Sequence, residues 1–168
     1  MELRQAKGCH LWRCLFTPSL TDAEVLKNYV QAATFLTLDR VKLKKLYLER
    51  PNRFRLQIPT EDGELLELEL FRKEILTSDF YLDDEENDVK NYDSGNFYHG
   101  YLVSNPKSIA AISIFDDKVY GMISVEGRTL VLGHQNQDRF PAGNDYLLYD
   151  ESDLLIESSF KCGSDELP

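Results

Sequence analysis

The chain has 168 residues, of which 42% are hydrophobic, 11% aromatic and 29% charged. This is an ordinary globular composition, sufficient for one domain with a buried core and too apolar for a wholly disordered chain. The formal net charge of −10 argues against a nucleic-acid-binding protein, because phosphate contacts require a basic surface. No stretch approaches the roughly 20 apolar residues of a membrane-spanning helix, so the sequence predicts no membrane span.

The charges are unevenly distributed. Residues 1–60 carry 11 Lys and Arg against 5 Asp and Glu, whereas residues 61–168 carry 8 against 24. The asymmetry marks either an acidic surface that docks on a partner or a solvated surface whose two halves attract each other within one fold. On composition alone the second interpretation is favoured.

Residues 1–20 show no export signal, because Arg13 interrupts their only apolar patch. Three cysteines are too few for a disulfide framework, although Cys9 and Cys14 could bridge in an oxidising compartment. Cys162 is then either a buried apolar side chain or a thiol with a function.

Two helices are predicted near the N-terminus. Residues 22–33 follow the capping box Thr21-Asp22-Ala23-Glu24 at helical spacing, although the Tyr-Val and Thr-Phe-Leu-Thr runs favour strand. A second helix is predicted over 39–49, where apolar side chains share one face and basic side chains occupy the others. Pro51 ends it, since a residue before proline is pushed out of the helical region.

Beyond the second helix the hydrophobic period changes to two. Apolar side chains alternate over residues 54–58 and 66–70, on either side of the turn Thr60-Glu61-Asp62-Gly63. This pattern predicts a β-hairpin, in which Arg53 and Arg55 are expected to face glutamates of the opposite strand.

Short strands predominate from residue 97 onward. They are predicted at 97–103, 108–115, 118–125, 128–132 and 146–149, with a polar loop over 134–144. Strands at such regular spacing are typical of antiparallel sandwiches, barrels and meanders. The sequence therefore predicts a mainly β fold, an antiparallel sandwich or barrel-like meander, with one or two short N-terminal helices.

Residues 81–95 are predicted to be a loop with six acidic side chains. A loop of this length is either mobile or functional. A calcium site over 83–94 is a minor alternative, because an EF-hand counted from Asp83 would need Gly in place of Asp88 and Glu in place of Ser94.

No catalytic constellation is recognisable. The chain lacks H-E-x-x-H, C-x-x-C, G-x-S-x-G and phosphate-loop motifs, and His10, His99 and His134 are far apart in sequence. We therefore expect a chain that is not an enzyme.

The C-terminal segment carries a thiol that is expected to be accessible, Cys162, followed by Gly163. A thiolate is a strong zinc ligand, and one delivered to the open position of a catalytic zinc would displace the nucleophilic water. Lys161 would favour the thiolate. On these residues alone an ordinary cysteine is the simpler interpretation.

The stretch from Tyr98 to Ser113 resembles a motif in the propeptides of reprolysin (adamalysin) zinc metallopeptidases, roughly Y-H-G-x-V-x-x-x-P-x-S-x-V-A-L-S. The matching residues are Tyr98, His99, Gly100, Pro106, Ser108, Ala111 and Ser113. Residues 54–70 and 76–80 are similar to the propeptides of bacterial secreted members. The resemblance extends over residues 34–168.

The resemblance implies a propeptide that keeps a zinc metallopeptidase latent and assists its folding. Cys162 would be the cysteine switch that ligates the zinc, and Lys161, Gly163, Asp165 and Glu166 would support the switch loop. The zinc would belong to the partner, a reprolysin-like catalytic domain in cis or lost, and this chain would hold no cofactor of its own.

The implied organisation has a poorly defined segment over 1–20, a β-rich propeptide domain over 21–157 and a cysteine-switch tail over 158–168. The family implies a secreted or cell-envelope protein, although no signal peptide is visible. The alternative is a stand-alone β-rich binding module without inhibitory activity. In that case Cys162 would be inert and buried, and the acidic loop 81–95 would be the better contact region.

Overall fold

The computed structural model describes residues 14–19, 29–76, 95–134 and 145–155. Within these ranges the chain forms nine strands, one α-helix and one 3-10 turn. In chain order they are β1 (Phe16–Pro18), β2 (Thr34–Leu38), α1 (Arg40–Glu49), β3 (Arg53–Pro59), β4 (Leu65–Lys73), β5 (Asn96–Leu102), β6 (Asn105–Ile114), β7 (Val119–Val125), β8 (Arg128–His134), β9 (Asp145–Asp150) and η3 (Glu151–Asp153).

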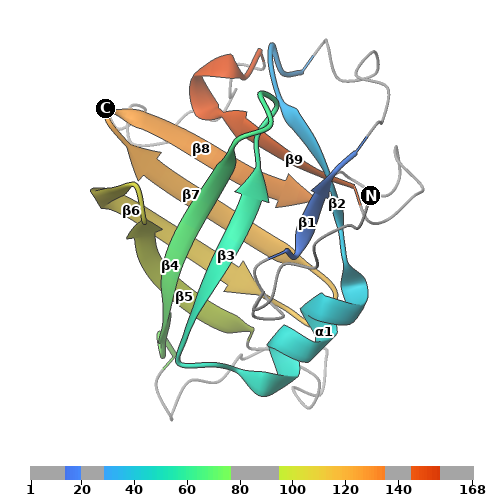
Figure 1. The fold of residues 1–168 in the computed structure, drawn as a ribbon, viewed down its shortest axis with the longest axis vertical. Helices are drawn as coiled ribbons and strands as arrows, with labels where there is room; N and C mark the ends of the chain where they lie inside the picture. Colours follow the sequence, from blue (N-terminus) through green and yellow to red (C-terminus); the bar gives the residue numbers. More distant parts are fainter. Residues whose placement is uncertain (1–13, 20–28, 77–94, 135–144, 156–168) are drawn as a thin grey trace, which may run out of the picture.

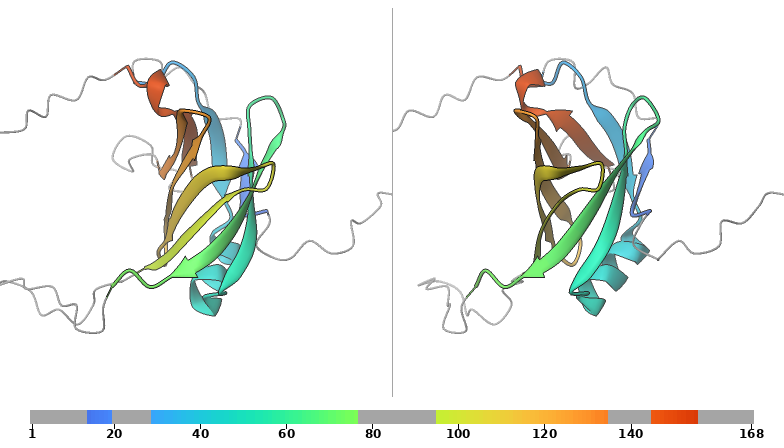
Figure 2. Two further views of the ribbon diagram at one scale, coloured as in Figure 1. Left: turned by 90° about the vertical axis from the view of Figure 1, so that its left-hand side faces the viewer. Right: turned by 60° about the vertical axis from the view of Figure 1, so that its left-hand side comes forward.

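All nine strands belong to one antiparallel sheet, in the order β1-β2-β9-β8-β7-β6-β5-β4-β3. Strands β3 to β9 form a meander, in which each strand pairs with the next along the chain. The sheet curls until its two outermost strands, β1 and β3, come close to each other, so that it forms a nearly closed barrel (Figures 1 and 2). The prediction of a mainly β, antiparallel fold is confirmed.

The interior of the barrel is the hydrophobic core, because successive side chains of a strand point to opposite faces of the sheet. In β3, Phe54, Leu56 and Ile58 are buried, whereas Arg53 and Arg55 between them are exposed. The largest fully buried side chains are Tyr146, Leu15, Leu36, Leu43, Leu46, Leu56, Ile58, Leu68, Leu70, Ile112, Ile114 and Ile123. Burying each such side chain contributes about 1.5–3 kcal/mol.

The predicted hairpin around Gly63 is confirmed as β3–β4. Phe54 lies opposite Leu70, and Leu56 lies opposite Leu68, so the alternating apolar residues share the inner face. Gly63 has a φ of +81°, a left-handed conformation that glycine adopts without strain.

The predicted helix over 39–49 is confirmed as α1, which covers one end of the barrel (Figure 1). Asp39 caps it, accepting a hydrogen bond from the Lys42 backbone N–H at 3.0 Å, and Leu43 and Leu46 enter the core. The helix ends at Arg50, whose φ of +46° is left-handed.

The predicted helix over 22–33 is wrong over residues 29–33. There the chain makes a turn, and Val30 forms a β-bridge with Leu154, so a strand-type contact replaces the expected helical hydrogen bonds. The Tyr-Val and Thr-Phe-Leu-Thr runs favour extended backbone, as the pairing of β2 with β9 shows. Residues 22–28 lie outside the described part.

The predicted strands after residue 97 are confirmed, with shifted ends. β6 begins at Asn105 and includes Pro106, rather than beginning at 108, and His134 ends β8 instead of opening a loop. β1 and β2 were not predicted. Residues 77–94, which hold most of the acidic loop and the calcium alternative, lie outside the described residues.

Candidate functional site: a docking face

The family-motif residues lie on the hairpin of β5 and β6. Tyr98, His99 and Gly100 belong to β5, and Pro106 and Ser108 belong to β6. The structure therefore brings these five residues together on one supersecondary unit. The question is which of them serve the fold and which face a partner.

The switch-loop residues belong to the C-terminal tail. The tail that carries them lies outside the described residues, so the structure does not test their roles. They are Lys161, Cys162, Gly163, Asp165 and Glu166.

Gly100 serves the fold. A Cβ atom at this position would lie 1.8 Å from the backbone oxygen of Glu69 on the neighbouring strand. No other residue type allows the two backbones to approach this closely. The pairing register also shifts between Gly100 and Leu102, so the glycine lies where the sheet is irregular.

Ser108 holds the same irregular region together. Its hydroxyl accepts a hydrogen bond from the Leu102 backbone N–H at 2.7 Å and donates one to the Asn105 backbone oxygen at 2.7 Å. The side chain is buried, so these bonds satisfy a polar group that burial would otherwise penalise. Pro106 lies near the beginning of β6, a position that tolerates a residue without a backbone N–H.

Tyr98 and His99 point to opposite faces. Tyr98 is 3% exposed and packs edge-on against Phe54, with ring centroids 4.9 Å apart. Burial raises the pKa of Tyr98, and its buried hydroxyl has no hydrogen-bond partner among the described residues. His99 faces outward and is exposed, so it is a motif residue that a partner could contact.

The outer surface around His99 is apolar. His99 pairs with Ala111, which pairs with Met122, so the three side chains form a row across β5, β6 and β7. Met122 is 49% exposed, and its neighbours Ile109 and Tyr120 are 66% and 44% exposed. We call these five residues the docking face. Contiguous exposed apolar residues commonly mark a protein-interaction surface.

Aromatic side chains surround the docking face. Phe71 lies against His99 with ring centroids 6.1 Å apart, and Phe115 lies against Tyr120 at 6.2 Å. A shallow hollow is lined by Phe115, Tyr120 and the turn between β6 and β7. Rings held by mutual contacts lose little conformational freedom when a partner binds, and aromatic residues are enriched in interface hot spots.

A buried ion pair lies beside this aromatic group. Glu69 is 3% exposed, and its two carboxylate oxygens accept hydrogen bonds from the Nε atoms of Arg53 and Arg55, each at 2.6 Å. These bonds, above all the one from Arg53, lower the pKa of Glu69. The Arg53 guanidinium also lies 5.4 Å from the centre of the Phe71 ring. The expected cross-strand pairing of these arginines with glutamate is confirmed.

The described residues contain no group of three or more His, Cys, Asp and Glu side chains that could hold a metal ion. His134 lies on β8 against Tyr146, 5.1 Å between ring centroids, and so does not join His99 on β5. The docking face is the candidate functional site that the described part of the chain presents.

The chain matches no protein-family model and no curated protein at a significant level. Across the described ranges, the structure contains no helix long and apolar enough to span a membrane.

The sequence analysis missed Ile109, Tyr120 and Met122. A signal was present, since residues 109–112 and 122–123 are apolar at consecutive positions and therefore on both faces of their strands. In an antiparallel sheet with one solvated face, apolar residues on both faces indicate a second contact surface.

Proposed function

We propose that this chain is the propeptide of a reprolysin-like zinc metallopeptidase. The folded barrel docks on the catalytic domain through the docking face, and the tail keeps the enzyme latent. The single observation that carries the docking step is the exposed row His99–Ala111–Met122, which begins on the two strands that bear the family-like motif and continues onto β7.

In this proposal, inhibition is a ligand-exchange step at the partner's zinc. The Cys162 thiolate takes the fourth coordination position, and the water that would attack the peptide bond is excluded. Lys161 favours the thiolate, Gly163 allows close approach of the backbone, and Asp165 or Glu166 pairs with Lys161 to shape the loop. The barrel raises the local concentration of the thiol at the zinc.

Docking on the folding catalytic domain would also assist its folding. A partner that binds only the folded state stabilises that state by mass action. A secreted or cell-envelope location would follow from the same proposal, because the enzyme and its propeptide are exported together in the family.

The test is stoichiometric mixing of the full chain with a reprolysin-like catalytic domain from the same genome, measuring binding and peptidase activity separately. We expect inhibition at a 1:1 ratio. Cys162→Ala should retain binding but lose inhibition, because only the zinc ligand is removed. The double variant Ile109→Glu/Met122→Glu should lose at least about 100-fold in affinity, because two carboxylates would be buried against apolar surface.

The matched control is Val41→Glu/Leu48→Glu. These residues are 82% and 64% exposed on α1, so the control adds the same charge to exposed aliphatic positions elsewhere. It should bind like the wild type. Unchanged inhibition by Cys162→Ala would exclude the cysteine switch, and unchanged binding by the docking-face variant would exclude that face.

The second candidate function is a stand-alone binding module. The observation that favours it is that the docking face belongs to the barrel and does not depend on the tail. Binding through Ile109 and Met122 without any inhibition would establish this alternative. Slow labelling of Cys162 by a thiol reagent, in a chain whose other two cysteines are serine, would agree with it.

A further inference from the structure

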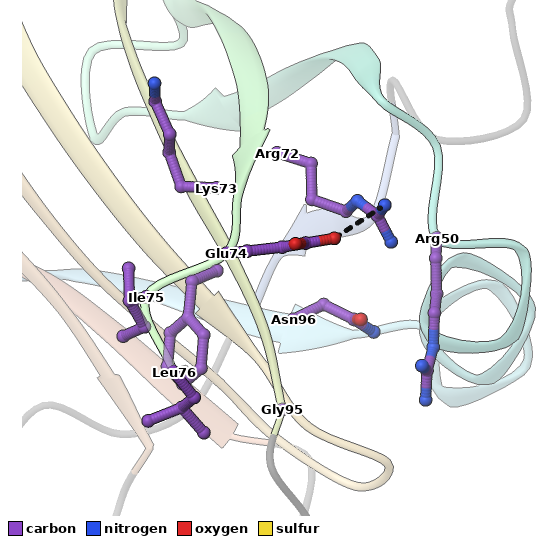
Figure 3. Close-up of a pocket in the computed structure, with 9 residues that line it drawn as sticks. Arg50, Arg72, Lys73, Glu74, Ile75, Leu76, Gly95 and Asn96 are labelled. Atoms are coloured by element: carbon purple, nitrogen blue, oxygen red, sulfur yellow. Dashed lines mark ion pairs between the residues drawn. The ribbon is translucent and has the colours of Figure 1, made fainter. Parts of the chain in front are cut away.

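A basic hollow lies at the end of the barrel that α1 covers. It has a volume of about 170 Å³ and is bounded by Arg50 at the end of α1, by Arg72 and Glu74 at the end of β4 and by Asn96 at the start of β5 (Figure 3). It is distinct from the docking face, which lies on the outside of the sheet. A space of this size admits a carboxylate group together with ordered water.

The polar groups of the hollow are held by the fold. Arg72 lies directly opposite Tyr98 in the register of β4 and β5, so the two side chains share the inner face. Asn96 is 5% exposed, and its side-chain nitrogen donates to the Tyr47 backbone oxygen at 3.0 Å. Arg50 lies over the Tyr47 ring, 5.7 Å from its centre. Packing on Tyr47 therefore positions the Arg50 guanidinium, whereas the Arg72 guanidinium is paired with Glu74.

The buried Tyr98 hydroxyl lies on the same inner face as Arg72, although Tyr98 is not among the residues that line the hollow. It lacks a hydrogen-bond partner among the described residues, which is uncommon for a buried polar group. Burial raises the pKa of Tyr98, and the charges of Arg72 and Arg50 act in the opposite direction. The basic side chains of Arg50 and Arg72 in a hollow whose one carboxylate is largely exposed together indicate an anionic ligand.

The charges near the hollow leave an excess of positive charge. Arg50, Arg72 and Lys73 line it, against the single carboxylate of Glu74. Glu74 is 84% exposed on its side chain and stands 3.6 Å from Arg72. An exposed pair of this kind is weak, so a better-placed carboxylate can replace it.

The position of the hollow favours a carboxylate over a phosphate. It lies at the C-terminal end of α1, where the helix dipole is negative and disfavours a doubly charged anion. A carboxylate carries one charge and fits the planar guanidinium group. The apolar side chains of Ile75 and Leu76 line one side, as Figure 3 shows, and suit the carbon chain of a peptide.

We propose that this hollow binds a carboxylate side chain of an acidic peptide segment through Arg72 and Arg50. The carboxylate can come from a partner protein or from the acidic residues 83–93 of this chain, because the recognising chemistry is the same. The inference stands apart from the proposed propeptide function and does not require it.

The test uses the full chain and the peptide acetyl-Asp-Asp-Glu-Glu-amide, with acetyl-Asn-Asn-Gln-Gln-amide as the uncharged comparison. Binding is followed by the NMR signals of the Asn96 side-chain amide. We expect the acidic peptide alone to shift them. Arg72→Gln should weaken binding at least 10-fold, whereas Glu74→Gln should strengthen it several-fold, because a competing carboxylate is removed.

The matched control is Lys107→Gln, which removes the same charge from an exposed position on β6, a strand whose residues do not line the hollow. It should change the affinity by less than twofold. Arg50→Gly provides a second loss of charge that the fold tolerates, because Arg50 already has a left-handed φ of +46°. Equal weakening by Arg72→Gln and Lys107→Gln would overturn the proposal.

A further variant distinguishes the two sources of the carboxylate. In it Asp83, Asp84, Glu85 and Glu86 become Asn, Asn, Gln and Gln. If the chain's own acids occupy the hollow, the peptide should bind this variant at least 10-fold more tightly than the wild type. If a partner supplies the carboxylate, the two affinities should be equal. Failure of the peptide to bind either protein would overturn the proposal.

Discussion

The inner and outer faces of β5, β6 and β7 are formed by alternating residues of the same three strands. The inner residues pack in the core, whereas the outer residues are more exposed. On the inner face Tyr98, Ile112 and Ile123 are almost fully buried. On the outer face Ile109 and Met122 are 66% and 49% exposed. A motif that spans both faces therefore mixes residues that specify the fold with residues available to a partner. Gly100 and Ser108 belong to the first kind, and His99 to the second.

The largest expected effect is that of Gly100→Ala. The added Cβ would collide with the Glu69 backbone oxygen, so the β4–β5 pairing must separate, at a cost of at least about 3 kcal/mol in the free energy of unfolding. The control is Gly133→Ala on β8, where a Cβ would meet no atom within 4 Å, and we expect a change within about 0.5 kcal/mol. Urea denaturation measures both. Equal effects would show that Gly100 does not specify the fold.

A smaller effect is expected from a matched pair on β6, Ile112→Ala and Ile109→Ala. Ile112 is 1% exposed on the inner face and Ile109 is 66% exposed on the outer face. The first variant should lose about 2–5 kcal/mol of unfolding free energy, because it leaves a cavity. The second should lose less than about 1 kcal/mol, because it changes only strand preference. Similar losses would mean that Ile109 is also part of a packed core.

The smallest expected effect concerns Glu69, an outer-face residue that is nevertheless buried. Its pKa is lower in the folded than in the unfolded chain, so its ion pairs stabilise the fold above about pH 4.5 and are lost as the pH falls below that value. Glu69→Gln should lower the unfolding free energy at pH 7 by about 1–2 kcal/mol. The unfolding free energy of this variant should also fall less steeply than that of the wild type when the pH is lowered into the acid range.

The control for Glu69 is Glu64→Gln, which removes a carboxylate from the exposed residue just before β4. It should leave the shape of the stability curve unchanged between pH 7 and pH 3. An identical curve for Glu69→Gln and the wild type would mean that Arg53 and Arg55 do not stabilise the fold through this carboxylate.

Local sequence patterns were sufficient to predict an element wherever that element contacts its neighbours in the sequence. The β3–β4 hairpin, the helix α1 and the successive strands β5 to β8 each follow from periodicity and a turn signal, because their partners are adjacent along the chain. The opposite holds for β2, whose partner β9 begins more than 100 residues later at Asp145. No local pattern identifies such a partner, and the helix predicted over 22–33 failed where residues 29–33 form a turn and a bridge to Leu154.

The two candidate sites also differ in how far the sequence could predict them. The sequence pointed to His99 through a resemblance, but it could not show which motif residues face outward, because this depends on the register of β5 and β6. The basic hollow was not predicted, since Arg50, Arg72 and Asn96 are widely separated in sequence and meet only when α1 covers the end of the barrel.

The sequence by itself determined that this chain folds as a mainly β domain, because hydrophobic period and turn chemistry are local properties of the chain. It also determined the alternation that places one set of side chains inside. Only the tertiary structure decided that the sheet curls into a nearly closed barrel, since closure depends on β1 approaching β3 and on β2 pairing with β9. The tertiary structure also decided the two candidate sites, because the outer row depends on the register of β5, β6 and β7 and the basic hollow on the placement of α1 beside the ends of β4 and β5.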